Sequence, residues 1–207
     1  FLSFPMRITV LGSGTSHGIP VIGCQCDVCR SSNPKNKRTR SSLWIKTPQT
    51  SLLFDTATDF RTQAIRESIS SLNAVFLTHA HADHIHGLDD LRPLTYEHPI
   101  PIYGNRPTLR EVEQRFDYIF RSTQKGGGKP RVDLHIIHQE SITFADCTVT
   151  PIPIKHGDLD ILGFRIGDVA YCTDCSCIPC TSYPLLEGVE ILIIGALRYS
   201  RHPTHFS

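Results

Sequence analysis

The sequence predicts an α/β (α+β) fold with one functional site at an edge of a β-sheet. Short apolar runs with the length and composition of strands recur along the chain, and segments with apolar residues at helical spacing lie between them. Four of the predicted strands are followed by, or end in, an acidic or histidine side chain: Asp55, His79, His156 and Asp174. One site at one edge of a sheet layer explains this repetition, so we expect these side chains to lie together.

The composition is that of an ordinary soluble globular protein. The chain has 207 residues, of which 40% are apolar and 20% charged, and its formal net charge is +1. No apolar run approaches the roughly 20 residues that cross a bilayer, and the first residues lack a signal-peptide pattern, which favours a cytoplasmic protein without a membrane partner. The only methionine, Met6, precedes the first predicted strand. We therefore assign a single domain to residues 6–207 and interpret residues 1–5 as an extension or as vector-derived.

The predicted elements follow one another without an internal repeat. Strands are predicted at residues 6–11, 43–46, 51–55, 74–77, 99–103, 134–137, 142–144, 148–154, 162–166, 169–172 and 189–194, the last as a buried strand. Helices are predicted at residues 59–69, with Asp59 as N-cap, at residues 85–94, limited by Pro93, and at residues 108–120. The glycine-rich turn at residues 12–18 allows close backbone approach and is expected to bring a loop near the site. Residues 124–130 are expected to form a flexible loop.

The segment at residues 78–84 contains a cluster of metal-binding side chains. It reads THAHADH and directly follows a strand-like apolar run, so that His79, His81, Asp83 and His84 stand at a strand end. Imidazole nitrogen is a good ligand for zinc and neighbouring first-row metals, and carboxylate oxygen can join it or bridge to a second ion. A surface histidine cluster is the alternative, but the acid in this register after a strand favours ligands for two metals.

Two groups of cysteines follow the same C-x-C-x-x-C spacing. Cys24, Cys26 and Cys29 can hold one face of a tetrahedral zinc whose fourth ligand comes from elsewhere, so a structural zinc is predicted, with free buried thiols as the alternative. The second group, Cys175, Cys177 and Cys180, directly follows Asp174, and its role is left open between metal binding and packing. Clustered thiols in a reducing compartment favour metal thiolates over disulfides.

A basic stretch runs from residue 30 to residue 46, with six cationic side chains and no acidic one. These cations are Arg30, Lys35, Lys37, Arg38, Arg40 and Lys46. A solvated basic loop is one interpretation, and attraction of a phosphate-bearing substrate is the other.

Together these residues resemble the metallo-β-lactamase superfamily, in particular its branch of PhnP-like and tRNase Z-like phosphodiesterases. The resemblance extends over nearly the whole chain after Met6. The matching features are the turn after the first strand, Cys24, Cys26 and Cys29, Asp55, the segment HAHADH, His156, Asp174 and the segment HPTH at residues 202–205. The fold it implies is a four-layer αββα sandwich, with two mixed sheets covered by helices.

The resemblance also implies a ligand set for two divalent metal ions. His79, His81 and His156 would bind one ion, Asp83 and His84 the other, and Asp174 would bridge them. Two such ions, zinc or manganese or iron, can hold a hydroxide between them and neutralise charge on a phosphodiester. In the family, further histidines that follow the equivalent of Ser207 complete the second ion's ligands and the thiolate zinc. The chain is therefore expected to be truncated at its C-terminus.

The expected function is that of a metal-dependent phosphodiesterase. Its substrate would be a small cyclic or nucleotide-like phosphodiester, with Asp83 and His205 as catalytic residues and His205 as general acid or phosphate contact. A tRNA 3′-processing endonuclease is an alternative that the near-zero net charge disfavours, since nucleic acid binding calls for a basic surface. A thioester hydrolase of the same fold and a non-catalytic zinc-binding protein are the others, and a homodimer is left open.

Overall fold

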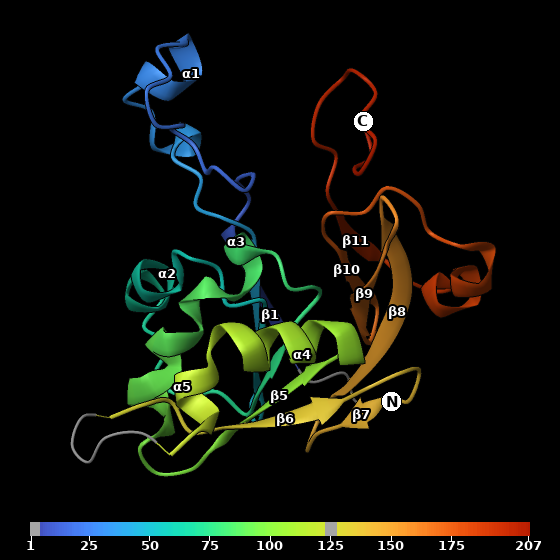
Figure 1. Ribbon diagram of the computed structural model, residues 1–207. Coiled ribbons are helices and arrows are strands. Elements are labelled where there is room, and N and C mark those ends of the chain that lie inside the picture. Colours follow the sequence, from blue (N-terminus) through green and yellow to red (C-terminus); the bar gives the residue numbers. More distant parts are fainter. Residues whose placement is uncertain (1–4, 123–127) are drawn as a thin grey trace.

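Two β-sheets lie face to face in the computed structural model (Figure 1). The structure describes residues 5–122 and 128–207. Most of the predicted extension, residues 1–4, and most of the predicted loop, residues 124–127, therefore lie outside the described residues. The mixed α/β sandwich that the sequence predicts is confirmed, since helices and two sheets build this fold.

The first sheet has six strands in the order β1-β2-β3-β4-β5-β6. Its strands are β1 (Arg7–Gly12), β2 (Ser42–Lys46), β3 (Ser51–Phe54), β4 (Ala74–Phe76), β5 (Ile100–Gly104) and β6 (Val132–Ile136). Strands β1 to β3 pair antiparallel, whereas β3 to β6 pair parallel. Strands β3 and β4 are buried along their whole length, because parallel strands at the centre of such a sheet are covered on both faces.

The second sheet has five strands in the order β11-β10-β9-β8-β7. They are β7 (Ile142–Thr143), β8 (Thr148–His156), β9 (Leu159–Ile166), β10 (Val169–Cys172) and β11 (Ile191–Ile194). The pairing is antiparallel except between β10 and β11. The predicted hairpin of β9 and β10 turns at Gly167, whose φ of 60° suits glycine.

Aromatic rings fill the space between the sheets. Phe54 on β3, Phe76 on β4 and Phe164 on β9 are fully buried, and their ring centroids are 5.3 to 5.5 Å apart. Rings at this spacing contribute attraction beyond the area they bury. These ring contacts fix the position of one sheet relative to the other. The site needs this because its residues come from strand ends of both sheets.

Helices cover the outer face of the first sheet (Figure 1). They are α2 (Phe60–Arg66), α3 (Ala82–Ile85), the 3₁₀ helix η2 (His86–Thr95), α4 (Arg106–Arg115) and α5 (Asp117–Phe120). The single helix predicted at residues 108–120 is thus divided at Phe116, and the one predicted at residues 85–94 is largely 3₁₀. Asp59 stands at the predicted N-cap position but caps nothing, because its carboxylate binds the backbone N–H and guanidinium of Arg40 at 2.9 to 3.2 Å.

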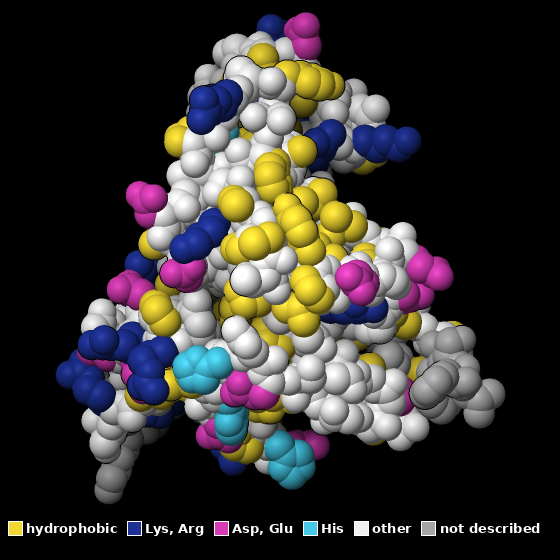
Figure 2. Space-filling model, turned by 90° about the vertical axis from the view of Figure 1, so that its right-hand side faces the viewer, with side chains coloured by type: hydrophobic (Ala, Val, Ile, Leu, Met, Phe, Trp, Pro, Cys, Tyr) yellow, Lys and Arg dark blue, Asp and Glu magenta, His cyan; other side chains and the backbone are white. Residues whose placement is uncertain are grey.

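The outer face of the second sheet has a smaller cover. The 3₁₀ helix η3 (Cys180–Leu186) and the residues around Phe206 pack there against Ile152, Ile154 and Ile161. Seen from this side, the molecule carries a broad band of apolar side chains (Figure 2). None of the helices in the described ranges combines the length and apolar character that crossing a membrane requires.

The prediction of a buried strand at residues 189–194 is wrong in its burial. Strand β11 is present, but Ile191, Leu192 and Ile194 are exposed. The reason is its position, because β11 is the edge strand of the second sheet and pairs only with β10 among the described residues. An apolar run shows strand propensity but not whether another element covers the strand.

A long excursion leaves the sandwich between Ile19 and Arg38. It contains α1 (Asp27–Arg30) and the 3₁₀ helix η1 (Pro34–Asn36), and it projects from the sheets at the same end of the molecule as the C-terminal segment (Figure 1). At its base, Ile19 and Arg38 exchange two backbone hydrogen bonds of 2.8 Å. The cysteines of the predicted zinc site lie within this excursion.

Candidate metal centre

The predicted metal ligands meet at one edge of the two sheets. His79 follows β4, His156 ends β8, Asp174 follows β10, and Asp83 and His84 lie on α3. The second sheet therefore supplies His156 and Asp174, and the first sheet with its following helix supplies the others. We expected side chains at successive strand ends to lie together, and the structure agrees with this expectation.

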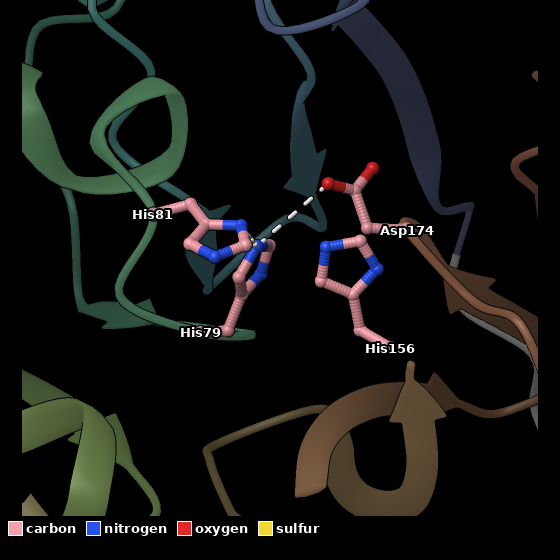
Figure 3. A group of neighbouring side chains, drawn as sticks. All are labelled: His79, His81, His156 and Asp174. Carbon is pink, nitrogen blue, oxygen red and sulfur yellow. Dashed lines mark hydrogen bonds and ion pairs between the residues drawn. The ribbon is translucent and has the colours of Figure 1, made fainter. Parts of the chain in front are cut away.

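The first donor group consists of three imidazoles and a carboxylate. His79, His81, His156 and Asp174 each offer one ligand atom, and these atoms lie within 4.8 Å of one another (Figure 3). His79 Nε2 is 2.9 Å from His81 Nδ1 and 3.7 Å from Asp174 Oδ2. A donor set of this composition and convergence fits a divalent first-row metal ion.

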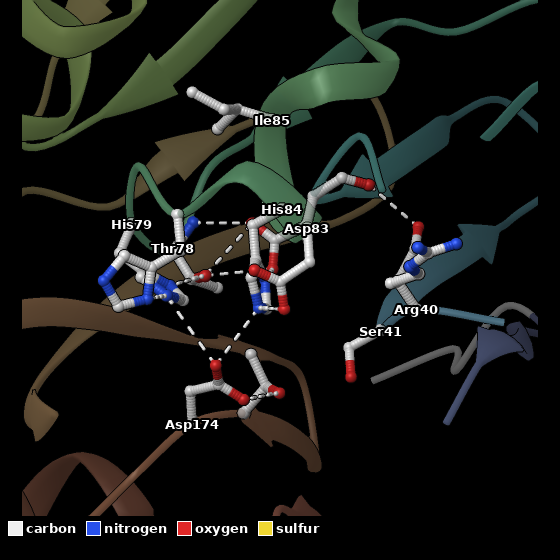
Figure 4. Close-up of polar contacts among 12 residues, drawn as sticks. Arg40, Ser41, Thr78, His79, Asp83, His84, Ile85 and Asp174 are labelled. Atoms are coloured by element: carbon white, nitrogen blue, oxygen red, sulfur yellow. Dashed lines mark hydrogen bonds and ion pairs between the residues drawn. The ribbon is translucent and has the colours of Figure 1, made fainter. Parts of the chain in front are cut away.

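The second donor group shares one member with the first. Asp83, His84 and Asp174 also place one ligand atom each within 4.8 Å of the others. His84 Nε2 lies 3.2 Å from Asp174 Oδ2 and 3.4 Å from Asp83 Oδ2 (Figure 4). Asp174 therefore stands between the two groups, where one carboxylate can serve two ions.

Hydrogen bonds at Nδ1 orient His84 and His156, and sequence reasoning assigned neither contact. The fully buried Asp55 accepts hydrogen bonds from the Thr78 N–H at 2.8 Å and shares one with His84 Nδ1 at 2.7 Å. His156 Nδ1 donates to the Thr204 carbonyl at 2.7 Å. In both histidines Nε2 is left to face the donor groups, which is how neighbouring groups orient metal ligands. The signal for Asp55 was its place after a strand, whereas a backbone carbonyl such as that of Thr204 gives no sequence signal.

Burial and neighbouring charges shift the pKa values of the candidate ligands. Burial and the nearby imidazoles hold the pKa of His79 well below its ordinary value, and burial also lowers the pKa of His81. Burial opposes ionisation of Asp174, but its contacts with His84 outweigh burial and lower its pKa. Burial by itself would lower the pKa of His84, yet the charge of Asp55 raises it well above its ordinary value. Neutral imidazoles and an ionised carboxylate are the ligand forms, so the shifts at His79, His81 and Asp174 favour metal binding, whereas His84 would have to release a proton when an ion binds.

Two aspartates at the site adopt the left-handed backbone region. Asp55 has a φ of 62° and Asp174 a φ of 51°. This region costs a non-glycine residue about 1–3 kcal/mol, although aspartate tolerates it better than most. Both residues turn the chain sharply at a strand end, and both direct a carboxylate toward His84.

A cavity of about 620 Å³ opens beside the donor groups. It is lined by residues of the loop at 13–19, by Arg38 and Ser41, by the donors His81, Asp83, His156 and Asp174, by Thr173, by residues 195–197, and by His202 and His205. The expectation that the glycine-rich turn approaches the site is confirmed. His17, at the end of this turn, also lines the cavity.

His205 lies next to the first donor group. Its ring centroid is 4.7 Å from that of His156, and its Nδ1 is 4.0 Å from Asp174 Oδ1. Burial lowers its pKa, although the charge of Asp174 acts in the opposite direction. His202 stands behind it, with the two ring centroids 4.9 Å apart. The structure therefore places His205 at the wall of the cavity, beside the candidate ligands His156 and Asp174.

The cysteines of the excursion form a third donor group. One sulfur each from Cys24, Cys26 and Cys29 lies within 4.8 Å of the other two, which fits a thiolate-bound ion such as zinc. The Val21 N–H donates to Cys29 Sγ at 3.4 Å and fixes that side chain. Cys175, Cys177 and Cys180 form no such group within residues 5–122 and 128–207: Cys175 packs in the core under η3, and the other two are exposed.

Comparison with known proteins shows which family and which relatives this chain resembles. A family model described as the beta-lactamase superfamily domain matches residues 50–207. The crystal structure of a new diphosphatase from the PhnP family is 43% identical, has a TM-score of 0.90, and is matched over 98% of this chain and 78% of that chain. An octanoyltransferase from Porphyromonas gingivalis is 42% identical over 97% of this chain and 41% of that protein. A ribonuclease Z from Picosynechococcus sp. is 30% identical over 79% of this chain and 47% of that protein.

The chain spans less than half the length of these two curated relatives. The resemblance seen in the sequence is nevertheless confirmed, because PhnP-family and ribonuclease Z proteins both appear among the relatives. The family model covers more than half of the chain, and all the candidate ligands of the two His/Asp groups lie within the matched residues. The chain belongs to the beta-lactamase superfamily and has the metallo-β-lactamase fold.

Proposed function

We propose that this chain is a metal-dependent hydrolase that cleaves a phosphorus–oxygen bond in a small phosphodiester. The observation that carries the proposal is the pair of donor groups that share Asp174 at the wall of a cavity. In the reaction, water forms a new bond to phosphorus, one ester bond breaks, and the products are a phosphomonoester and an alcohol.

The ligands divide between two ions. His79, His81 and His156 with Asp174 would hold one, and Asp83 and His84 with Asp174 the other. When bound, two divalent ions supply an activated water and neutralise the charge of the phosphodiester. Zinc, manganese and iron all suit histidine and carboxylate donors. The thiol group of Cys24, Cys26 and Cys29 is separate from this centre and would hold a structural zinc.

The protein's own side chains orient the site and the substrate. Asp55 and the Thr204 carbonyl fix the rings of His84 and His156, so that the donors are arranged before substrate arrives. His205 lines the cavity and is proposed to contact the scissile phosphate. An imidazole there can donate an N–H to a phosphate oxygen.

Relatives support phosphorus–oxygen cleavage more than the alternatives. The PhnP-family diphosphatase matches almost the whole chain at 43% identity. The octanoyltransferase matches over 41% of its length, so its name describes a much longer protein, and acyl transfer is not proposed for this chain. The ribonuclease Z relative keeps RNA cleavage as the alternative, which the net charge of +1 disfavours.

A turnover assay with bis(p-nitrophenyl) phosphate tests the proposed function. We expect hydrolysis by the zinc- or manganese-loaded protein, a loss of at least about 100-fold after chelation, and recovery when the ion is returned, because water activation depends on the ion. A thioester and a tRNA precursor serve as comparison substrates. Hydrolysis of either of these without diester turnover would contradict the proposal, and so would diester turnover that chelation leaves unchanged.

A further inference from the structure

The cavity has two chemically different walls. One wall carries the candidate metal ligands His81, Asp83, His156 and Asp174. The other is formed by the loop at residues 13–19 together with Arg38 and Ser41. A volume of about 620 Å³ lies within the range of pockets that enclose whole small ligands, so there is room for substrate groups beyond one phosphate.

Arg38 is the cation of the second wall. Among the residues that the structure describes, no other lysine or arginine lines the cavity. Its neighbour Arg40 differs in this respect, because Arg40 binds the carboxylate of Asp59 at 3.0 and 3.2 Å. Arg38 has no acidic partner within the described ranges. Its charge is therefore available to a ligand in the cavity.

The backbone and the Nε of Arg38 are held in place, whereas its two terminal guanidinium nitrogens have no hydrogen-bond partner among the described residues. Two backbone hydrogen bonds of 2.8 Å tie it to Ile19, and its Nε donates to the Lys35 carbonyl at 3.3 Å. Gly14 packs against it so closely that a Cβ at residue 14 would lie 2.5 Å from the Arg38 carbonyl oxygen. Neither terminal guanidinium nitrogen donates to any described residue. Such a planar fork can bind a phosphoryl group through two parallel hydrogen bonds.

The rest of this wall offers further hydrogen-bond donors. Ser13, Thr15 and Ser16 line the cavity with hydroxyl groups. The backbone N–H groups of Ser16 and His17 donate to no residue within the described ranges. Hydroxyls and successive free N–H groups suit an anion, and no carboxylate from the described residues lies on this wall, where Ile19 is an apolar member.

We propose that Arg38 and the loop at residues 13–17 bind a second phosphoryl group of the substrate, so that diphosphate-containing esters are the preferred substrate class. The inference rests on the proposed function, because it assumes that the scissile phosphate lies at the His/Asp donor groups. Arg38 is then a specificity-determining residue: it binds the phosphoryl group that is not attacked. A substrate with a single phosphate leaves this contact unused.

Two matched esters test the assignment. They are the p-nitrophenyl esters of adenosine 5′-monophosphate and adenosine 5′-diphosphate, which differ by one phosphoryl group, with products separated by chromatography. For the diphosphate ester, Arg38→Ala is expected to lower kcat/KM about 10- to 100-fold, mainly through a higher KM, as loss of a charge-assisted contact predicts. For the monophosphate ester the fall is expected to be no more than about 3-fold. Arg38→Lys should recover part of the loss, because the charge returns without the fork.

A neighbouring cation provides the control. Lys37 is exposed and does not line the cavity, so Lys37→Ala should change kcat/KM of neither ester by more than about 2-fold. An equal fall for both esters in Arg38→Ala would overturn the proposal, since Arg38 would then act on the scissile phosphate or on the fold. No change for either ester would overturn it as well.

Equilibrium binding separates this inference from the proposed function. If the parent protein hydrolyses neither ester, the proposed function fails, yet the second-phosphoryl subsite can still be measured with adenosine mono- and diphosphate as probes in a calorimetric titration. The parent protein is expected to bind the diphosphate at least about 10-fold more tightly, and Arg38→Ala to lose that preference. Equal affinity of the parent for the two nucleotides, or an unchanged preference in the variant, would contradict the role of Arg38.

Discussion

Replacing Asp83 by asparagine is expected to lower kcat/KM for bis(p-nitrophenyl) phosphate by about 10³-fold or more, which corresponds to roughly 4 kcal/mol of transition-state stabilisation. The reason is that Asp83 belongs to the second donor group, 3.4 Å from His84 Nε2, and an amide is a much weaker metal ligand than a carboxylate. The Asp83 side chain is half-buried and is not part of the hydrophobic core, so the variant should still fold. Turnover and metal content, measured on the same sample, check the prediction.

The control for Asp83 is another aspartate near the site. Asp158 is exposed, follows His156 by two positions and does not line the cavity, so Asp158→Asn should keep both turnover and bound metal within about 2-fold of the parent. Loss of one ion per chain in Asp83→Asn alone would support the second donor group. Full metal content with unchanged turnover in Asp83→Asn would remove this residue from the mechanism.

Replacing Asp55 by asparagine is expected to lower the free energy of unfolding by about 3–5 kcal/mol. The reason is that the buried, positively charged His84 would lose the negative charge that faces it. Asp55 and His84 are both fully buried, and their Oδ2 and Nδ1 atoms are 2.7 Å apart. The carboxylate also accepts from the Thr78 N–H and hydroxyl, and asparagine cannot accept at all of these positions. Denaturant unfolding of the metal-free protein measures the change.

A metal titration distinguishes orientation by Asp55 from bulk stability. If Asp55 orients His84, metal affinity at the second donor group should fall about 10- to 100-fold in the folded variant. Asp133 is an exposed aspartate on β6 whose carboxylate has no hydrogen-bond partner among the described residues. It is the control, and Asp133→Asn should change the unfolding free energy by less than about 0.5 kcal/mol. A change below about 1 kcal/mol in Asp55→Asn would contradict the buried ion pair.

The donor positions could be predicted from sequence because they follow local patterns. His79 comes after a short apolar strand, His156 ends a strand, and Asp174 follows one, so that a strand pattern alone places each of them at a sheet edge. The family resemblance then grouped them by ion. The structure brings the same residues together in two groups that share Asp174.

What could not be predicted depends on contacts between distant segments. The Thr204 carbonyl that orients His156 is 48 residues away, and the pairing of Asp59 with Arg40 replaced the predicted helix cap. The exposure of β11 depends on its place at the sheet edge, which an apolar run does not reveal. Arg38 belonged to a basic stretch without a distinguishing pattern, and only the fold separates it from Arg40.

An anomalous difference map of the zinc-loaded protein tests the central claim most directly, because it locates each ion beside its ligands. We predict two peaks at the His/Asp site, about 3.5–4 Å apart, with Asp174 between them, and a third peak at Cys24, Cys26 and Cys29. The first peak should contact His79, His81 and His156, and the second Asp83 and His84. A map with a single peak or none at the His/Asp site, under conditions in which the thiolate site is filled, would contradict the dinuclear centre.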